Sequence, residues 1–272
     1  MPDLTGANTP VAASDAPNAQ AIAHLTRTDP VMAGLIGAVG PCGLLADTLG
    51  SPFQTLAQAI THQQLNGTAA RTILTRFIQC CGKAGAFPTP QEVVKAKDKT
   101  LRAAGLSFAK IAALKDLARK TLDGTVPEHD TLVSLPDEQI IERLTQVRGI
   151  GRWTVEMMLM FRLGRPDILP ADDFGVRAGF KLTYGLRQMP APRALAAYAE
   201  KWSPHRTVAA WYLWRAVEWA RAGKLPLPAE KIKLKAVRRK KRKSAKKKNV
   251  GKKKSVRKKK KTKTTRSKRA HK

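Results

Sequence analysis

The chain has 272 residues and carries 51 Lys+Arg against 20 Asp+Glu, a formal net charge of +31 that favours a polyanionic partner. Its three cysteines, Cys42, Cys80 and Cys81, are too few for an even disulfide framework or for the four thiolates of an iron-sulfur cluster. We therefore expect reduced thiols, no metal and no cofactor. No apolar run is long enough to cross a membrane, so no membrane partner is expected.

The uneven distribution of charge divides the chain into three parts. Residues 228–272 hold 25 of the 51 Lys+Arg and a single acid, Glu230, and self-repulsion without a core predicts a disordered tail. Residues 1–18 lack the basic start and apolar core of a secretion signal and predict a disordered leader. Residues 19–227 have the length and apolar content of one globular domain.

Helical patterns follow one another through the globular part. The predicted starts and breaks are marked by caps, prolines and glycines at Ala19, Asp29-Pro30, Gly40-Pro41, Ser51-Pro52 and Asn66-Gly67. Residues 68–81 again have a helical pattern, and short helices are expected after Pro88-Thr89-Pro90 and over residues 99–105.

A longer amphipathic helix is predicted to begin at Ser107. Its apolar side holds Ile111, Leu114, Leu117 and Leu122, and its basic side, which we expect to be only solvated, holds Lys110, Lys115, Arg119 and Lys120. Two further helices are predicted over residues 192–202 and 204–222. Because no alternating strand pattern occurs, the expected fold is all-α with two helical lobes.

The segment Val147–Arg152 places two glycines around one apolar residue, between two helical patterns. It predicts a helix-hairpin-helix, in which free amides at the start of the second helix bind a phosphate. The predicted contacts with the DNA backbone come from Arg148, Gly149, Ile150, Gly151 and Arg152, and they would read no base sequence. A tight helical corner with capping glycines is the alternative.

Two adjacent carboxylates, Asp172 and Asp173, follow Pro170-Ala171 at the start of the next helical pattern. One of them can cap that helix while the other points elsewhere, or both can serve as caps.

Together these motifs resemble the helix-hairpin-helix (HhH-GPD) glycosylase superfamily of base-excision repair, and within it the DNA-3-methyladenine glycosylase II branch. The resemblance rests on Gly149-Ile150-Gly151-Arg152-Trp153-Thr154, followed about twenty residues later by Pro170-Ala171-Asp172-Asp173. It implies that Asp173 is catalytic and leaves Asp172 as a helix cap or orienter. Bifunctional relatives carry a lyase Lys at the position of Trp153, so a monofunctional enzyme is implied.

The resemblance also assigns residues to base recognition and to duplex opening. It places the base pocket at Trp153, Met157, Phe174 and Trp214, and leaves Trp211 and Trp219 to packing. Gln64 or Leu65 would be the wedge that enters the duplex, although from sequence alone Gln63 and Gln64 are more typical of an exposed helix end.

The expected reaction is the hydrolytic release of alkylated purines such as 3-methyladenine and 7-methylguanine, which leaves an abasic site. The positive charge of such a base weakens its glycosidic bond, so a carboxylate that stabilises the sugar cation is enough to catalyse release of the base. The alternatives are a non-enzymatic helix-hairpin-helix DNA-binding or nucleoid-organising protein, and a glycosylase for oxidised or mismatched bases.

The expected partner is double-stranded DNA that contains damaged bases, bound by a monomer. The tail is expected to bind the DNA phosphate backbone, with RNA, an acidic protein or a nuclear address as alternatives. The expected location is the cytoplasm, associated with the nucleoid, if the source is bacterial, and the nucleus if it is eukaryotic.

Overall fold

The computed structural model describes residues 18–47 and 50–225, which contain helices and loops but no β-strand. The all-α prediction is confirmed. The predicted tail and nearly all of the predicted leader lie outside the described residues. Within the described ranges, no helix combines the length and the apolar content that a bilayer crossing needs.

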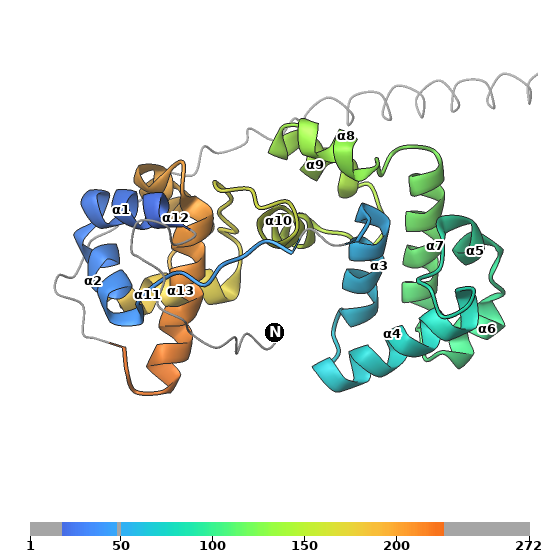
Figure 1. The fold of residues 1–272 in the computed structure, drawn as a ribbon. Coiled ribbons are helices and arrows are strands. Elements are labelled where there is room, and N and C mark those ends of the chain that lie inside the picture. Colours follow the sequence, from blue (N-terminus) through green and yellow to red (C-terminus); the bar gives the residue numbers. More distant parts are fainter. Residues whose placement is uncertain (1–17, 48–49, 226–272) are drawn as a thin grey trace, which may run out of the picture. The chain divides into compact units, whose positions relative to one another are not determined.

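One group of helices, the terminal lobe, joins the two ends of the described chain (Figure 1). It contains α1 (Ala19–Thr28), α2 (Pro30–Val39), α11 (Phe174–Thr183), α12 (Pro192–Tyr198), the 3₁₀ helix η1 (Ala199–Trp202) and α13 (Arg206–Arg221). The largest contact in this lobe is between α11 and α13.

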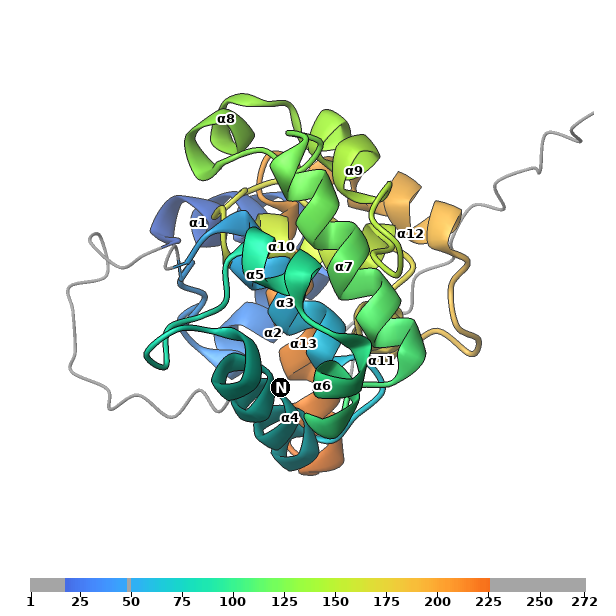
Figure 2. The ribbon, with the colours of Figure 1, turned by 90° about the vertical axis from the view of Figure 1, so that its right-hand side faces the viewer.

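The central lobe is built from the helices between α2 and the hairpin. Its members are α3 (Pro52–His62), α4 (Gly67–Cys81), α5 (Pro90–Lys95), α6 (Asp98–Ala103), α7 (Phe108–Leu122), α8 (His129–Ser134) and α9 (Asp137–Leu144). Helix α7 packs against α3, α5 and α6, as Figures 1 and 2 both show. Helix α10 (Arg152–Phe161) packs on α9 and also reaches the terminal lobe, where Phe161 stacks on Trp214 of α13.

The predicted break at Asp29 organises the terminal lobe. The carboxylate is fully buried, and its Oδ1 accepts the amides of Val31 and Met32 at 3.2 Å as the cap of α2. Its Oδ2 accepts the Tyr184 hydroxyl at 2.7 Å and the Trp202 indole N–H at 2.8 Å. One carboxylate therefore ties the start of α2 to the end of α11 and to η1, because a buried charge is stable only when its oxygens are hydrogen-bonded.

Two glycines of α11 allow it to approach α13 so closely that no side chain would fit between the two helices. A Cβ at Gly179 would lie 1.9 Å from the Leu213 carbonyl oxygen, and one at Gly175 would lie 2.8 Å from Cδ1 of Trp214. Any larger residue at Gly179 would force the helices apart. This close packing fixes the start of α11 against the middle of α13.

The local start signals are confirmed, because Ser51, Ser107 and Thr89 each accept the amide three residues ahead. The expectation of a merely solvated basic face on α7 is wrong. Lys110 Nζ donates to the Thr61 carbonyl of α3 at 2.7 Å, and Lys115 and Lys120 pair with Asp98 and Asp116.

Two further details of the sequence reading differ from the structure. Leu122 is 49% exposed at the end of α7, so it does not belong to the buried face. The six-residue helix α8 was not predicted, since it buries only Leu132 and has no apolar periodicity to reveal it.

Candidate active site

The hairpin predicted at Val147–Arg152 joins α9 to α10. The amides of Val147 and Ile150 donate to the carbonyls of Leu144 and Val147 at 3.1 and 3.0 Å, and Gly149 has a φ of +79°. Both apolar side chains of the turn, Val147 and Ile150, are buried. The turn is thus anchored by its apolar residues, while its glycines are exposed.

The hairpin offers backbone donors for an anion. Within the described part of the chain, the amides of Gly149 and Gly151 have no hydrogen-bond acceptor, and the first amides of α10 have none inside the helix. The amide of Arg148 is different, because it donates to Oδ2 of Asp116 at 2.8 Å. Its guanidinium, on an exposed residue, remains available to a phosphate.

Arg152 is held by carboxylates of the protein itself. Its guanidinium binds both oxygens of Glu138, at 2.6 and 3.1 Å, and Oε1 of Glu156 at 2.9 Å. This arrangement links α9 to α10 beside the turn. The two carboxylates also neutralise the positive charge of Arg152, which was expected to face DNA. A phosphate contact from the Arg152 side chain would have to compete with these ion pairs and stays a prediction.

Asp173 is the point at which three helices converge. Its Oδ1 accepts the Val176 amide of α11 at 2.7 Å and the Trp214 indole N–H of α13 at 2.9 Å. Its Oδ2 accepts the Trp153 indole N–H of α10 at 2.8 Å. The carboxylate is half-buried and is fixed in position by three donors, two of them rigid rings.

The helix-cap role expected of Asp172 belongs to Asp173, which is the N-cap of α11. The physical reason is reach, because an N-cap side chain bonds to the amide three residues ahead, and Val176 is three residues after Asp173. Asp172 is exposed and adds negative charge near Glu156 instead. Burial raises the pKa of Glu156, and although the Arg152 hydrogen bond lowers it, the charge of Asp172 raises it further.

The aromatic residues expected in a base pocket surround this carboxylate to different extents. Trp153 is 50% exposed and Phe174 is 72% exposed, so both keep ring surface free for a ligand. Trp214 is half-buried and stacks on Phe161, with ring centroids 5.9 Å apart. Met157 lies one turn after Trp153 on α10 and is half-buried against the core.

Sequence reasoning did not give Phe161 or Gly175 a place in the site. Phe161 supports the Trp214 ring from α10, and Gly175 leaves room for that ring beside Asp173. The available signal for Phe161 was its helical spacing from Met157. Trp211, assigned to packing, is buried and meets Tyr212 edge-on.

Comparison with known proteins decides the family. Residues 57–205 match the family model of the HhH-GPD superfamily base excision DNA repair proteins. The chain belongs to this superfamily.

Relatives of this HhH-GPD protein carry related names. The chain is 42% identical over 164 residues to DNA-3-methyladenine glycosylase 1 of Schizosaccharomyces pombe, covering 60% of this chain and 72% of the relative. It is 29% identical over 195 residues to DNA-3-methyladenine glycosylase 2 of Escherichia coli, covering 68% and 64%.

Solved structures agree with the fold of the HhH-GPD protein. The S. pombe 3-methyladenine DNA glycosylase in complex with abasic DNA matches with a TM-score of 0.63 and 38% identity over 72% of this chain and 95% of that one. A DNA-3-methyladenine glycosidase of Bacillus halodurans matches with a TM-score of 0.68 and 33% identity over 76% and 93%.

The predicted wedge residues of this HhH-GPD protein lie in the turn between α3 and α4. Gln64 is exposed, with a φ of +59°, and Leu65 is 39% exposed. Neither touches Asp173 by a hydrogen bond. The turn is instead linked to the hairpin, because Gln63 Nε2 donates to the Gly149 carbonyl at 2.9 Å.

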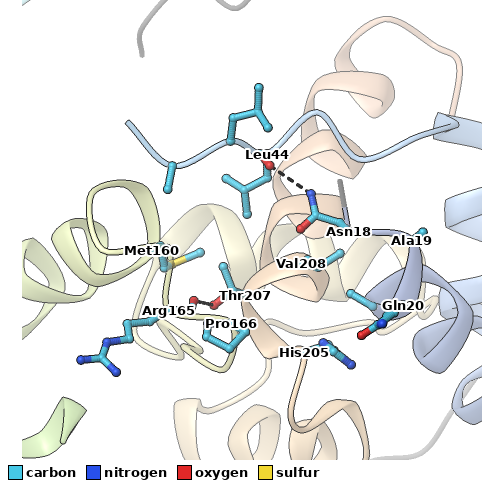
Figure 3. A pocket seen from close by; sticks show the side chains of 14 residues that line it. Asn18, Ala19, Gln20, Leu44, Met160, Arg165, Pro166, His205, Thr207 and Val208 are labelled. Carbon is cyan, nitrogen blue, oxygen red and sulfur yellow. Dashed lines mark hydrogen bonds between the residues drawn. The ribbon is translucent and has the colours of Figure 1, made fainter. Parts of the chain in front are cut away.

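A cavity of about 490 Å³ lies elsewhere in the HhH-GPD protein, lined by the start of α1, residues 44–46, the loop after α10 and the start of α13. Figure 3 shows two hydrogen bonds in its wall, from Asn18 to the Leu44 carbonyl and from Thr207 to the Arg165 carbonyl. None of the predicted site residues lines it, so it has no assigned part in the reaction.

Proposed function

We propose that this protein is a monofunctional DNA glycosylase that hydrolyses the N-glycosyl bond of alkylated purines in duplex DNA and leaves an abasic site. The observation that carries the proposal is the carboxylate of Asp173, held by the indoles of Trp153 and Trp214 and by the Val176 amide. The family and the names of the relatives support the same reaction class.

The chemistry requires a fixed negative charge beside the sugar. Methylation at N3 or N7 makes the purine a cation and a good leaving group, so departure of the base needs no strong general acid. The sugar then develops oxocarbenium character, which a preorganised carboxylate stabilises. Oδ2 of Asp173 has one protein donor against two on Oδ1, and this leaves it the freer oxygen to orient the attacking water.

Base selection follows from the exposed aromatic faces next to Asp173. The electron-rich faces of Trp153 and Phe174 attract a cationic alkylated purine more strongly than its neutral parent. Because the indole N–H of Trp153 is bonded to Asp173, its ring is held at a fixed angle beside the carboxylate. The base would then be stacked in place as the bond to the sugar breaks.

DNA binding is assigned to the hairpin, where Arg148, Gly149 and Gly151 are exposed and the two glycine amides have no acceptor within the described residues. These groups suit a phosphate of the backbone and carry no base specificity. We further assign residues 228–272 to retention on DNA through counterion release. The protein would act as a monomer on the chromosome, in the nucleoid of a bacterium or the nucleus of a eukaryote.

The product is expected to be an intact abasic site. Strand cleavage by a lyase step needs an amine nucleophile at the sugar, and the position implied for that amine holds Trp153. An indole N–H cannot form a Schiff base.

One assay tests the proposal. Full-length protein is incubated with duplexes that each contain 3-methyladenine, 7-methylguanine, hypoxanthine, ethenoadenine or 8-oxoguanine, and base release is measured beside the Asp173→Asn variant. Release of the methylated purines by the wild type alone supports the proposal. DNA binding without release of any base would identify a non-enzymatic binder, and release restricted to 8-oxoguanine would change the substrate class.

A further inference from the structure

The turn between α3 and α4 has a conformation that must be held in place by its neighbours. Gln64 has a φ of +59°, in the left-handed region that non-glycine residues enter at a cost of about 1 kcal/mol or more. Its side chain and that of Leu65 are exposed, so they gain little packing in return. A strained turn with two exposed side chains persists only when the flanking residues determine its backbone.

Three hydrogen bonds at the flanking residues hold the backbone around this turn. Before the turn, Lys110 Nζ donates to the Thr61 carbonyl at 2.7 Å. After it, the Asn66 side chain caps α4 by accepting the Ala69 amide at 2.9 Å. Between them, Gln63 Nε2 donates to the Gly149 carbonyl at 2.9 Å, a contact that spans 86 positions in the sequence.

The contact from Gln63 falls on the peptide unit at the centre of the hairpin. The carbonyl of this unit, from Gly149, accepts Gln63, and its amide, from Ile150, donates to the Val147 carbonyl at 3.0 Å. Both ends of the peptide plane are therefore fixed. The free amides of Gly149 and Gly151 flank this plane, so its orientation sets the direction in which they point.

We propose that Gln63 is a positioning residue that couples phosphate binding at the hairpin to duplex opening by Gln64 and Leu65. The proposal rests on the proposed glycosylase function and goes beyond it by assigning a role to a residue outside the carboxylate site. When the hairpin binds a backbone phosphate, the Gln63 hydrogen bond places the turn at a fixed position relative to that phosphate. The wedge side chains then meet the base stack at a defined step of the duplex.

The coupling predicts that binding and opening separate when the hydrogen bond is lost. The hairpin keeps its other supports. The Ile150 amide still donates to the Val147 carbonyl and so holds the peptide plane, the Arg148 amide is still bound by Asp116, and α9 still packs on α10. Affinity for undamaged duplex should therefore persist. Opening should suffer, because unstacking a nucleotide costs a few kcal/mol and needs the wedge in the correct place.

The test uses full-length Gln63→Met, which keeps the length of the side chain and removes the donor without changing the charge. Gln58→Met is the matched control, since Gln58 lies in α3, which ends one residue before Gln63, and its side chain has no hydrogen bond within the described residues. Three quantities are compared with wild type: affinity for undamaged duplex, fluorescence of 2-aminopurine next to a 7-methylguanine, and single-turnover base release at saturating enzyme. Release is measured in a duplex and in a short mismatched bubble, with thermal unfolding recorded for each variant.

For Gln63→Met we expect unchanged affinity and unfolding temperature, a weaker 2-aminopurine signal, and duplex base release slowed about fivefold to tenfold. The bubble should restore release, because opening is already done, and Gln58→Met should match wild type throughout. Equal slowing in duplex and bubble, no slowing in either, or a joint fall of affinity and unfolding temperature would overturn the proposal. Absence of base release by wild type would refute the glycosylase function instead, while the fluorescence would still report on the coupling.

Discussion

The indole N–H of Trp153 lies 2.8 Å from Oδ2 of Asp173, so a side chain expected to bind the base also holds the carboxylate expected to act on the sugar. Trp214 does the same on Oδ1, at 2.9 Å. The residues proposed for base recognition therefore also hold the proposed catalytic carboxylate in place. Substitutions of either tryptophan should affect the chemical step as well as binding, since the two functions are mechanically linked.

We expect Asp173→Asn to lose base release on the order of a hundredfold or more, because the developing sugar cation loses its counter-charge. The fold should survive, since an asparagine oxygen can replace Oδ1 as cap of α11 and as acceptor for Trp214. Single-turnover kinetics and DNA affinity measure the two effects. Asp172→Asn should be milder, and greater sensitivity at Asp172 would show that the catalytic assignment is displaced by one residue.

We expect Gly175→Ala to slow base release about tenfold to a hundredfold by displacing the ring of Trp214. The added Cβ would lie 2.8 Å from Cδ1 and 3.0 Å from Nε1 of that ring, and 3.1 Å from Oδ1 of Asp173. Gly37→Ala, on α2, is the control, because a Cβ there meets nothing within 4 Å. The control should keep full activity, and equal kinetics for both variants would show that the Trp214 contact is dispensable.

We expect purified protein to leave an intact abasic site. Borohydride should trap no covalent adduct with DNA, since Trp153 offers no amine to the sugar. Denaturing electrophoresis with and without alkali makes the measurement. Strand cleavage that appears without alkali and persists through purification would contradict the monofunctional assignment.

Removal of Lys231 to Lys272 should weaken binding to undamaged DNA and flatten its salt dependence, since it deletes 25 basic residues and no acid. Single-turnover base release at saturating enzyme should stay within about twofold of wild type, because a charge-rich segment with few apolar residues does not shape a pocket. A salt titration of affinity beside the kinetics tests both points. An unchanged salt slope would show that this segment does not contact DNA.

The sequence by itself determined most of the helices, several of their caps and the two motifs of the candidate site. Ser51, Ser107 and the two glycines of the hairpin act on backbone groups within a few residues, so their effect can be inferred from local spacing. For the same reason the carboxylates before α11 could be recognised as a helix start. Which of the two is the cap required the geometry of the backbone.

Only the tertiary structure decided which side chains meet. Asp173 takes its indole donors from 20 and 41 positions away, and Gln63 reaches a carbonyl 86 positions along the chain. Arg152 is bound by Glu138 as well as by its helical neighbour Glu156, which no charge count along the chain could reveal. Such contacts depend on how whole helices pack, because close approach at positions such as Gly175 and Gly179 sets which polar groups come within hydrogen-bond distance.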